Sequence, residues 1–175
     1  MFFGLFGRKR DKEAVEALYR RISEASRAPF LYTHFAMPDT LEGRFDSLTL
    51  HAALVMRRLR ALPPPAGAVA QDLVDILFRE VDRTLREIGI GDLSIPKKMK
   101  LFAQTFYGRA RLFDEALEAD TDDALCRALS RASGGDAQNL PAFARHIRHA
   151  DEIMTVYDLA YILSGAPLFP AAPGD

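Results

Sequence analysis

Apolar residues recur at steps of three and four along most of the chain, and no convincing stretch alternates between apolar and polar positions as a β-strand does. The clearest run spans residues 39–62. Six apolar residues there share one face of a helix: Phe45, Leu48, Ala52, Val55, Leu59 and Leu62. Asp39 can cap this helix, and Glu42 three residues later completes an acidic variant of the capping box. The prolines at 63–65 end it, because proline lacks the backbone donor that a helix needs.

The same spacing predicts helices along the rest of the chain. They cover about 11–28, 68–88, a segment from 94 or 95 through 117, 122–132 and 141–164. Gly89 suits the left-handed position that follows a helix end, and Pro96 suits the first turn of the next helix. We therefore expect an all-α protein with a single compact helical domain of about five to seven helices at 11–165. An apolar and basic segment at 1–10 precedes this domain, and a loose proline-rich tail at 166–175 follows it.

Composition narrows the function classes. The 175 residues are enough for one domain with a core, and the net charge of −1 excludes a protein that binds polyanions through its overall charge. We expect no specific DNA binding, and any contact with nucleic acid or lipid must come from a local patch. Cys126 is the single cysteine, so an internal disulfide and an all-cysteine metal site are excluded.

The start of the sequence, MFFGLFGRKR, places basic residues after a short apolar run, which is the reverse of a secretory signal. No stretch reaches the roughly 18 unbroken apolar residues of a membrane span. We therefore expect a cytoplasmic protein that contacts the cytoplasmic face of the inner membrane as a peripheral protein. The residues predicted to contact an anionic bilayer are Phe2, Phe3, Leu5, Phe6, Arg8, Lys9 and Arg10. The alternative is that Leu5 and Phe6 pack back onto the domain.

Signatures of catalysis or cofactor binding are weak. The GIGD corner at 89–92 lies between two helices, so it lacks the strand-to-helix context of a phosphate-binding loop. His146 and His149 are spaced to share a metal, but they flank the apolar stripe that contains Ile147 and Ala150, which favours a position at its edge. Because no catalytic pair of carboxylates and no activated nucleophile is evident, we predict no enzyme activity, no cofactor and no metal site.

The helix that starts near residue 95 carries Lys97, Lys98 and Lys100 close to its N-terminus, where the helix dipole disfavours positive charge. These lysines form either a solvated face or a binding surface. Basic residues on both sides of the glycine corner favour the binding surface. The predicted partner-binding residues are Arg83, Arg86, Gly89, Gly91, Asp92, Lys97, Lys98, Lys100, Tyr107 and Arg109.

Two stretches resemble the ubiquinol–cytochrome c chaperone family: YTHFAMPDTLEGRFDSLTLH at 32–51 and FREVDRTLREIGIGDLSIPKKMKLFAQTFYGR at 78–109. The features that carry the resemblance are Gly-Arg-Phe-Asp in the first stretch and Gly-x-Gly-Asp-Leu, the lysine pair and Phe-Tyr-Gly-Arg in the second. The resemblance is close over about residues 30–120. Members of this family are assembly factors for ubiquinol–cytochrome c reductase, which is respiratory complex III, and they are not known as enzymes.

The mitochondrial members bind newly made cytochrome b, act with a smaller partner and associate with the ribosome. This chain is similar to a bacterial-type member, because its start does not have the composition of a mitochondrial transit peptide. The resemblance therefore implies a chaperone whose client is the cytochrome b subunit, with an anionic membrane surface or the ribosome as further partners. Two alternatives remain: a membrane-surface helical scaffold for another client, and a helical enzyme acting on a lipid or isoprenoid substrate. The enzyme needs acidic pairs that face a cavity.

Overall fold

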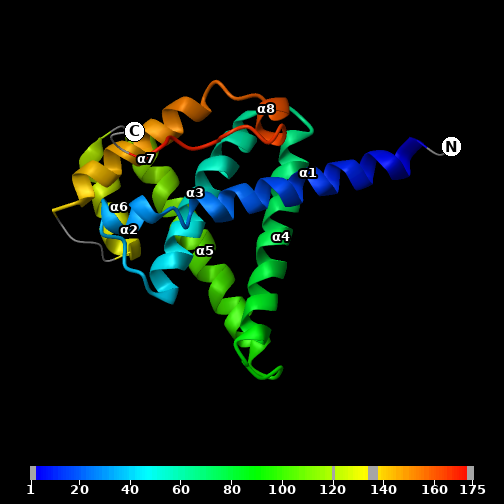
Figure 1. The fold of residues 1–175 in the computed structure, drawn as a ribbon, viewed down its shortest axis with the longest axis horizontal. Coiled ribbons are helices and arrows are strands. Elements are labelled where there is room, and N and C mark those ends of the chain that lie inside the picture. The colour runs from blue at the N-terminus through cyan, green and yellow to red at the C-terminus, as the bar shows by residue number, and fades with distance from the viewer. Residues whose placement is uncertain (1–2, 120, 134–137, 173–175) are drawn as a thin grey trace.

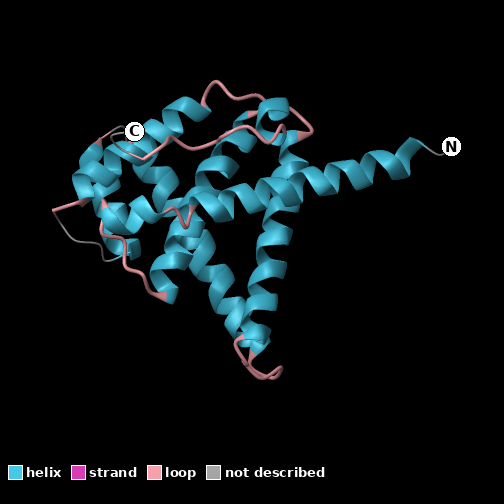
Figure 2. Cartoon of the chain, viewed as in Figure 1, coloured by secondary structure: helices cyan, strands magenta, loops and turns pink. Residues whose placement is uncertain are grey.

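The computed structural model describes residues 3–119, 121–133 and 138–172, with side chains for 12–119, 121–132 and 138–172. Helices are the only regular elements in these ranges, which confirms the predicted all-α class (Figures 1 and 2). In chain order they are α1 (Phe3–Ala25), α2 (Pro29–Thr33), α3 (Leu41–Ala61), α4 (Ala66–Glu87), α5 (Ile95–Glu118), α6 (Asp122–Ser133), α7 (Leu140–Met154) and α8 (Leu159–Leu163). The five-residue helix α2 is not predicted by the sequence, and the five-residue helix α8 lies within the span of the last predicted helix.

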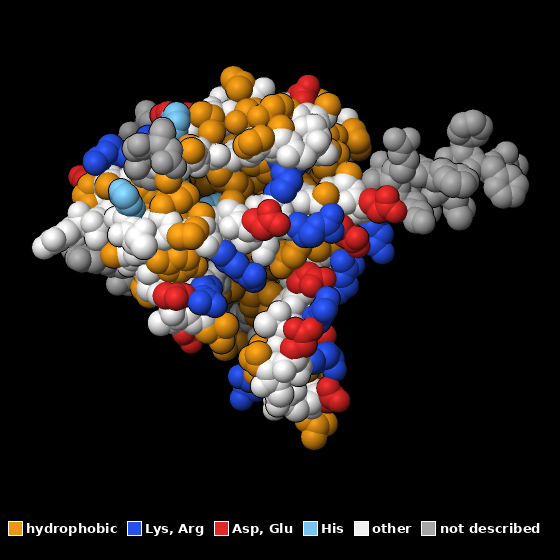
Figure 3. All heavy atoms as spheres, in the orientation of Figure 1, with side chains coloured by type: hydrophobic (Ala, Val, Ile, Leu, Met, Phe, Trp, Pro, Cys, Tyr) orange, Lys and Arg blue, Asp and Glu red, His pale blue; other side chains and the backbone are white. Residues whose placement is uncertain are grey.

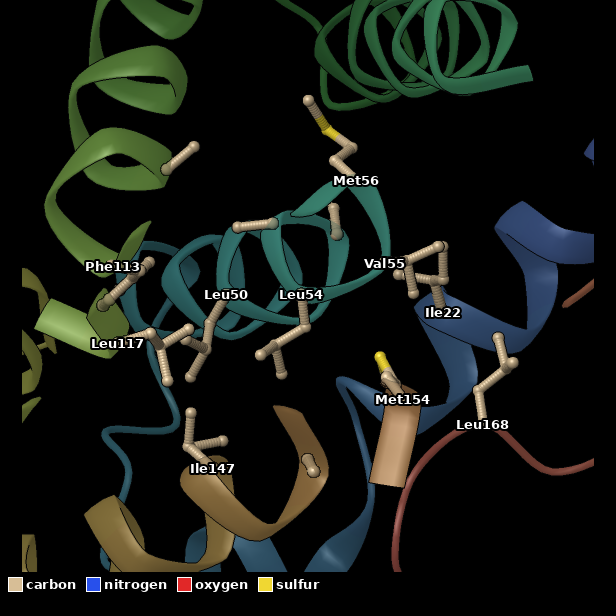
Figure 4. Packing of buried hydrophobic residues seen from close by; sticks show 14 of the residues in the cluster. Ile22, Leu50, Leu54, Val55, Met56, Phe113, Leu117, Ile147, Met154 and Leu168 are labelled. Atoms are coloured by element: carbon tan, nitrogen blue, oxygen red, sulfur yellow. The ribbon is translucent and has the colours of Figure 1, made fainter. Parts of the chain in front are cut away.

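The helix α3 lies at the centre of the fold and contacts α1, α4, α5, α6 and α7. Figure 4 shows Val55 beside Ile22 of α1, Met56 directed toward α4, and Leu50 on the side of Phe113 in α5. The side chains of α3 thus point in several directions, each toward a different neighbour. The core of the protein therefore surrounds α3, which is buried on several sides.

The middle of α3 is buried on every face, so the predicted single stripe is too narrow. Between positions 46 and 56 every residue except Leu48 is buried. The buried polar side chains here bond to backbone carbonyls: Ser47 Oγ donates to Ser26 at 2.7 Å, and Thr49 Oγ1 donates to Phe45 at 2.9 Å. Such bonds remove most of the cost of burying a hydroxyl. Polar residues on α3 therefore do not mark a solvent-facing side.

The cap of α3 differs from the predicted one. Thr40, not Asp39, is the N-cap, because its side chain accepts the backbone N–H of Gly43 at 3.0 Å. The Asp39 carboxylate instead accepts a bond from Arg44 Nε at 2.7 Å. Gly43 itself has no room for a side chain, since a Cβ there would lie 2.0 Å from the carbonyl oxygen of Pro38.

The last predicted helix, 141–164, is divided into α7 and α8. α7 ends at Met154, and Asp158 caps α8 by accepting the backbone N–H of Tyr161 at 2.7 Å. Arg58 of α3 donates from Nε to the carbonyl of Tyr157 at 2.7 Å, so a residue distant in sequence holds the turn between the two helices. The periodicity of the apolar residues passes through the turn and hides it.

The two ends of the chain also depart from expectation. α1 begins at Phe3 rather than near residue 11 and ends at Ala25. The proline-rich tail is not loose over its described part, since Leu168 is 3% exposed and the ring of Phe169 lies 4.8 Å from that of His51. Arg21 of α1 holds α8, the helix that precedes the tail, by donating from Nη1 to the carbonyl of Ile162 at 2.8 Å.

Candidate functional site

The α4–α5 hairpin projects from the body of the fold and turns through the loop at 88–94 (Figure 1). Gly89 has φ of +84°, which confirms the predicted left-handed position after the helix end. Its N–H donates to the carbonyl of Arg86 at 3.0 Å, and the N–H of Ile90 donates to that of Leu85 at 3.1 Å. These two bonds form a Schellman motif that satisfies the final carbonyls of α4. Gly91 has a negative φ and lies in open space.

Aromatic rings join the two helices of the hairpin near the body. The ring centroid of Phe78 in α4 lies 5.4 Å from that of Phe102 and 5.7 Å from that of Phe106, both in α5. Phe45 of α3 meets Phe102 at 4.7 Å, which ties the hairpin to the central helix. Nearer the turn, the side chain of Ile95 is only 2% exposed, so the start of α5 is also packed against the rest of the protein. Packing along this length fixes α4 and α5 relative to each other.

We call residues 88–101 the hairpin tip. Three large apolar side chains of the tip lie in solvent: Leu93 is 100% exposed, Leu101 63% and Ile88 57%. Figure 3 shows an apolar side chain at the apex of the projection, with basic and acidic side chains beside it. A single exposed leucine is ordinary on a protein surface, whereas three large exposed apolar side chains at the end of one projection are unusual.

The three lysines of the tip are exposed and free of ion pairs with any described residue. Lys97 and Lys98 lie in the first turns of α5, which has no acidic residue in its first turn and no side-chain bond at its N-cap Ser94. On a helix with about 100° between residues, Lys97 and Lys100 lie on the side opposite Ile95, whereas Lys98 lies about 60° from Ile95. The structure therefore places uncompensated positive charge beside the exposed apolar side chains.

Two arginines near the end of α4, Arg83 and Arg86, differ from the lysines, because acidic neighbours neutralise them. Arg83 pairs with Glu87 at 2.8 Å, and Arg86 pairs with Asp82 and with Asp92, both at 2.7 Å. The hydrogen bond that Arg83 donates to the Glu87 carboxylate raises the pKa of Arg83 above its ordinary value. Arg83, Arg86 and Asp92 thus lie at the same end of the hairpin as the lysines but contribute little net charge to it.

Arg109 does not join this surface. It lies farther along α5, where its guanidinium forms an ion pair with the buried carboxylate of Asp46 on α3 and covers the ring of Phe45 at 5.5 Å from the centroid. Burial lowers the pKa of Arg109 from its ordinary value. Tyr107, 51% exposed, packs its ring 5.3 Å from Phe106 and 5.9 Å from Phe78. Arg109 therefore joins α3 to α5, and sequence reasoning missed Asp46 as its partner.

A sequence model of the ubiquinol–cytochrome C chaperone family matches residues 33–169, which include α3, the hairpin and the helices that follow. The chain belongs to this family. A solved structure described as the crystal structure of the Cbp3 homolog from Brucella abortus is similar over 99% of both chains, with 31% sequence identity and a TM-score of 0.87. A comparison with curated proteins gave no match.

Two of the motifs that carry the sequence resemblance meet in space. Gly-Arg-Phe-Asp at 43–46 supplies Phe45 and Asp46, and Phe-Tyr-Gly-Arg at 106–109 supplies the arginine that contacts both. Phe106 is fully buried in the same region. These residues therefore hold α5 against α3, and in this way they fix the position of the projecting hairpin.

The residues predicted to contact a membrane at the N-terminus are placed only in part. Phe2 lies outside the described residues. Phe3, Leu5, Phe6, Arg8, Lys9 and Arg10 belong to the backbone of α1, and their side chains lie outside the description. Within the part of the chain that is described, the helices lack an apolar stretch long enough to cross a bilayer.

Two of the histidines, His51 and His146, pack against other side chains. His51 is buried in α3 with Nδ1 2.8 Å from the carbonyl of Ser47, and burial lowers its pKa to about 4. His146 packs its ring against Phe30 and Phe35, with centroids 5.3 and 5.1 Å away, while His149 is exposed as predicted for the edge of the stripe. Over residues 3–119, 121–133 and 138–172, no three His, Cys, Asp or Glu side chains gather to hold a metal.

A surface hollow of the described part of the chain carries both acidic and basic side chains. This hollow lies between α5 and α6, has a volume of about 200 Å³ and is open to solvent. Glu115 is the one carboxylate at its edge, and two arginines, Arg127 and Arg131, face it from α6. The hollow therefore lacks the paired carboxylates that a metal-dependent lipid or isoprenoid enzyme needs.

Proposed function

We propose that this protein is a non-enzymatic assembly chaperone of ubiquinol–cytochrome c reductase that binds newly made cytochrome b before it joins the complex. The observation that carries the proposal is the family match over residues 33–169. The similarity to the Cbp3 homolog over 99% of both chains supports it, because the likeness includes every element of the fold and is not limited to one motif.

The surface for the client or its surroundings is the α4–α5 hairpin. The lysines of the tip give it unpaired positive charge, and Leu93 gives it a fully exposed apolar side chain. Charge on such a surface speeds encounter and sets orientation more than it adds affinity. Gly89 and Arg109 act as positioning residues in this proposal, since one forms the turn and the other attaches α5 to α3.

The place of action is the cytoplasmic face of the inner membrane, where a newly made membrane subunit emerges near lipid headgroups and the ribosome. The N-terminal segment with Phe2, Phe3, Leu5, Phe6, Arg8, Lys9 and Arg10 is the proposed second contact with that surface. An anionic leaflet attracts such basic residues with about 1 kcal/mol each.

Deletion of the gene tests the proposal. We expect a large loss of assembled ubiquinol–cytochrome c reductase on native gels, restored when the full chain is supplied from a plasmid. A second respiratory complex, measured on the same membranes, is the control for general membrane damage. Normal levels of assembled reductase in the deletion strain contradict the assembly role.

Copurification identifies the client. Tagged cytochrome b should recover this protein from cells in which synthesis of the other reductase subunits is blocked, because the chaperone acts before they join. A tagged membrane subunit of another complex is the matched control. Equal recovery with both tags contradicts a specific role with cytochrome b and favours a general scaffold at the membrane surface.

A further inference from the structure

We propose that the hairpin tip docks on an anionic lipid bilayer, with Leu93 and Ile88 among the lipid headgroups and Lys97, Lys98 and Lys100 against the phosphates. This contact goes beyond the chaperone function, because it involves lipid alone and does not depend on which client the protein serves. It is also separate from the N-terminal segment, which leaves the body of the fold at another point (Figure 1).

The apex of the tip has the side chains that an interfacial contact needs. Leu93 is 100% exposed and lies in the loop, where α4 and α5 do not cover it, and Ile88 is 57% exposed at the end of α4. Exposure of large apolar side chains to water is unfavourable, and transfer into a headgroup region removes part of that cost. Leu101, 63% exposed, lies one turn beyond Lys97 and extends the apolar surface along α5.

The charged side chains of the tip are arranged so that they can bind a negatively charged surface. Asp82, Glu87 and Asp92 are each engaged by an arginine of α4, at 2.7 to 2.8 Å. The lysines are the charges left without a counterion among the described residues, and they flank the apolar side chains. A polybasic patch beside an apolar anchor is the combination that binds anionic lipid, since each component alone binds weakly.

The tip is held in position before it meets a membrane. The Schellman motif at Gly89 fixes the loop, and the side chain of Ile95 at the start of α5 is buried, with 2% exposed. The rings of Phe78 and Phe102 then keep the hairpin extended from the body. A preorganised tip loses little conformational freedom on binding, so even a small contact can be effective.

The apolar apex separates lipid from the other partners of a basic surface. An RNA phosphate backbone requires the lysines and does not require a leucine in the loop. A membrane requires both, and it draws Leu93 out of water. A probe at position 93 therefore reports the proposed contact directly.

The chain contains no tryptophan, so Leu93→Trp in the full chain gives a single fluorescent reporter. We expect its emission to shift to the blue with vesicles of phosphatidylethanolamine and phosphatidylglycerol, and to stay unchanged with phosphatidylcholine vesicles. Leu41→Trp, at a leucine that is 66% exposed on α3, is the matched control and should show no shift with either.

Flotation of the otherwise unaltered chain tests the lysines. Lys97→Glu/Lys98→Glu should reduce partitioning onto anionic vesicles by about five-fold or more for each lysine. Arg127→Glu/Arg131→Glu, an equal charge reversal at two exposed residues of α6, should have a smaller effect. Raising the salt concentration should weaken binding of the unaltered chain, because the contact is exposed and screened.

Three results overturn the proposal. If the protein floats with anionic vesicles but the emission of the tryptophan at position 93 does not shift, the membrane contact lies elsewhere in the chain. If the protein does not float at all, it does not bind the bilayer. Unchanged flotation of the lysine variant, together with reduced recovery by tagged cytochrome b, assigns the lysines to the client. Because vesicles contain no protein, failure here leaves the assembly function untouched, and a failed deletion test leaves the lipid contact untouched.

Discussion

Lys97 and Arg109 are basic residues of the same helix, about three turns apart, and the structure gives them opposite environments. Arg109 lies where α5 packs on α3, paired with a buried carboxylate and placed over an aromatic ring. Lys97 lies where α5 has left the body of the fold, exposed and without a counterion. The first residue stabilises the fold, and the second is available to a partner.

The difference arises from what each part of α5 can contact. The part around Phe106 meets α3 as well as α4, so its side chains are covered from two directions. The part that contains Lys97 extends beyond α3 and ends in the exposed loop. A basic residue in a motif is therefore no guide to a binding surface until its neighbours are known.

The largest expected effect comes from the body of the fold. Phe106→Ala should lower the free energy of unfolding by about 3–5 kcal/mol, because it leaves a cavity where a fully buried ring joined α5 to α4. Urea unfolding measures it. Leu93→Ala at the tip is the control and should change stability by less than about 0.5 kcal/mol. Equal effects would show that the tip is not independent of the core.

The ion pair between helices should rank second. Arg109→Leu leaves the Asp46 carboxylate buried without its partner, and we expect a loss of about 3 kcal/mol in the free energy of unfolding. The double variant Asp46→Leu/Arg109→Leu should be more stable than either single variant, since no charge is left buried. If the two single losses simply add in the double variant, the pair is not coupled.

His51 should make the body sensitive to acid. Its pKa is about 4 in the folded protein, because burial disfavours the charged ring, against an ordinary value of 6.5. Between these values the unfolded chain binds a proton that the folded chain does not, so stability falls as pH drops below about 6.5. The loss at pH 5 should be about 2 kcal/mol. In His51→Leu, unfolding measured at pH 7 and pH 5 should differ less; an unchanged difference would assign the acid sensitivity to other groups.

The smallest stability effect, of opposite sign, is expected at the tip. Lys97→Glu/Lys98→Glu places acids at the start of α5, where the helix dipole favours them, so stability should hold or rise by up to about 0.3–1 kcal/mol for each residue. Reductase assembly should nevertheless decrease at normal protein levels. Stability and function then move in opposite directions. Unchanged assembly in this variant would show that the lysines form only a solvated face.

Local sequence was enough to predict the class of fold and the turn of the hairpin. Apolar steps of three and four predicted α4 and α5 nearly to the residue, and Gly89 marked the end of α4 because few other residues accept its φ. The lysines could also be identified from local sequence, because the unfavourable interaction of their positive charge with the helix dipole depends only on their own helix.

Tertiary structure decided the rest, because it depends on contacts between residues far apart in the chain. Periodicity shows one buried face of a helix, so it could not show that α3 is covered on all sides or that the tail packs Leu168 into the core. Nor could it pair Arg109 with Asp46, or end α7 at a turn that Arg58 supports from α3. The sequence by itself determined the helical class, the long helices and the turn of the hairpin, whereas only the packing of those helices decided which basic residues are buried and which are left for a partner.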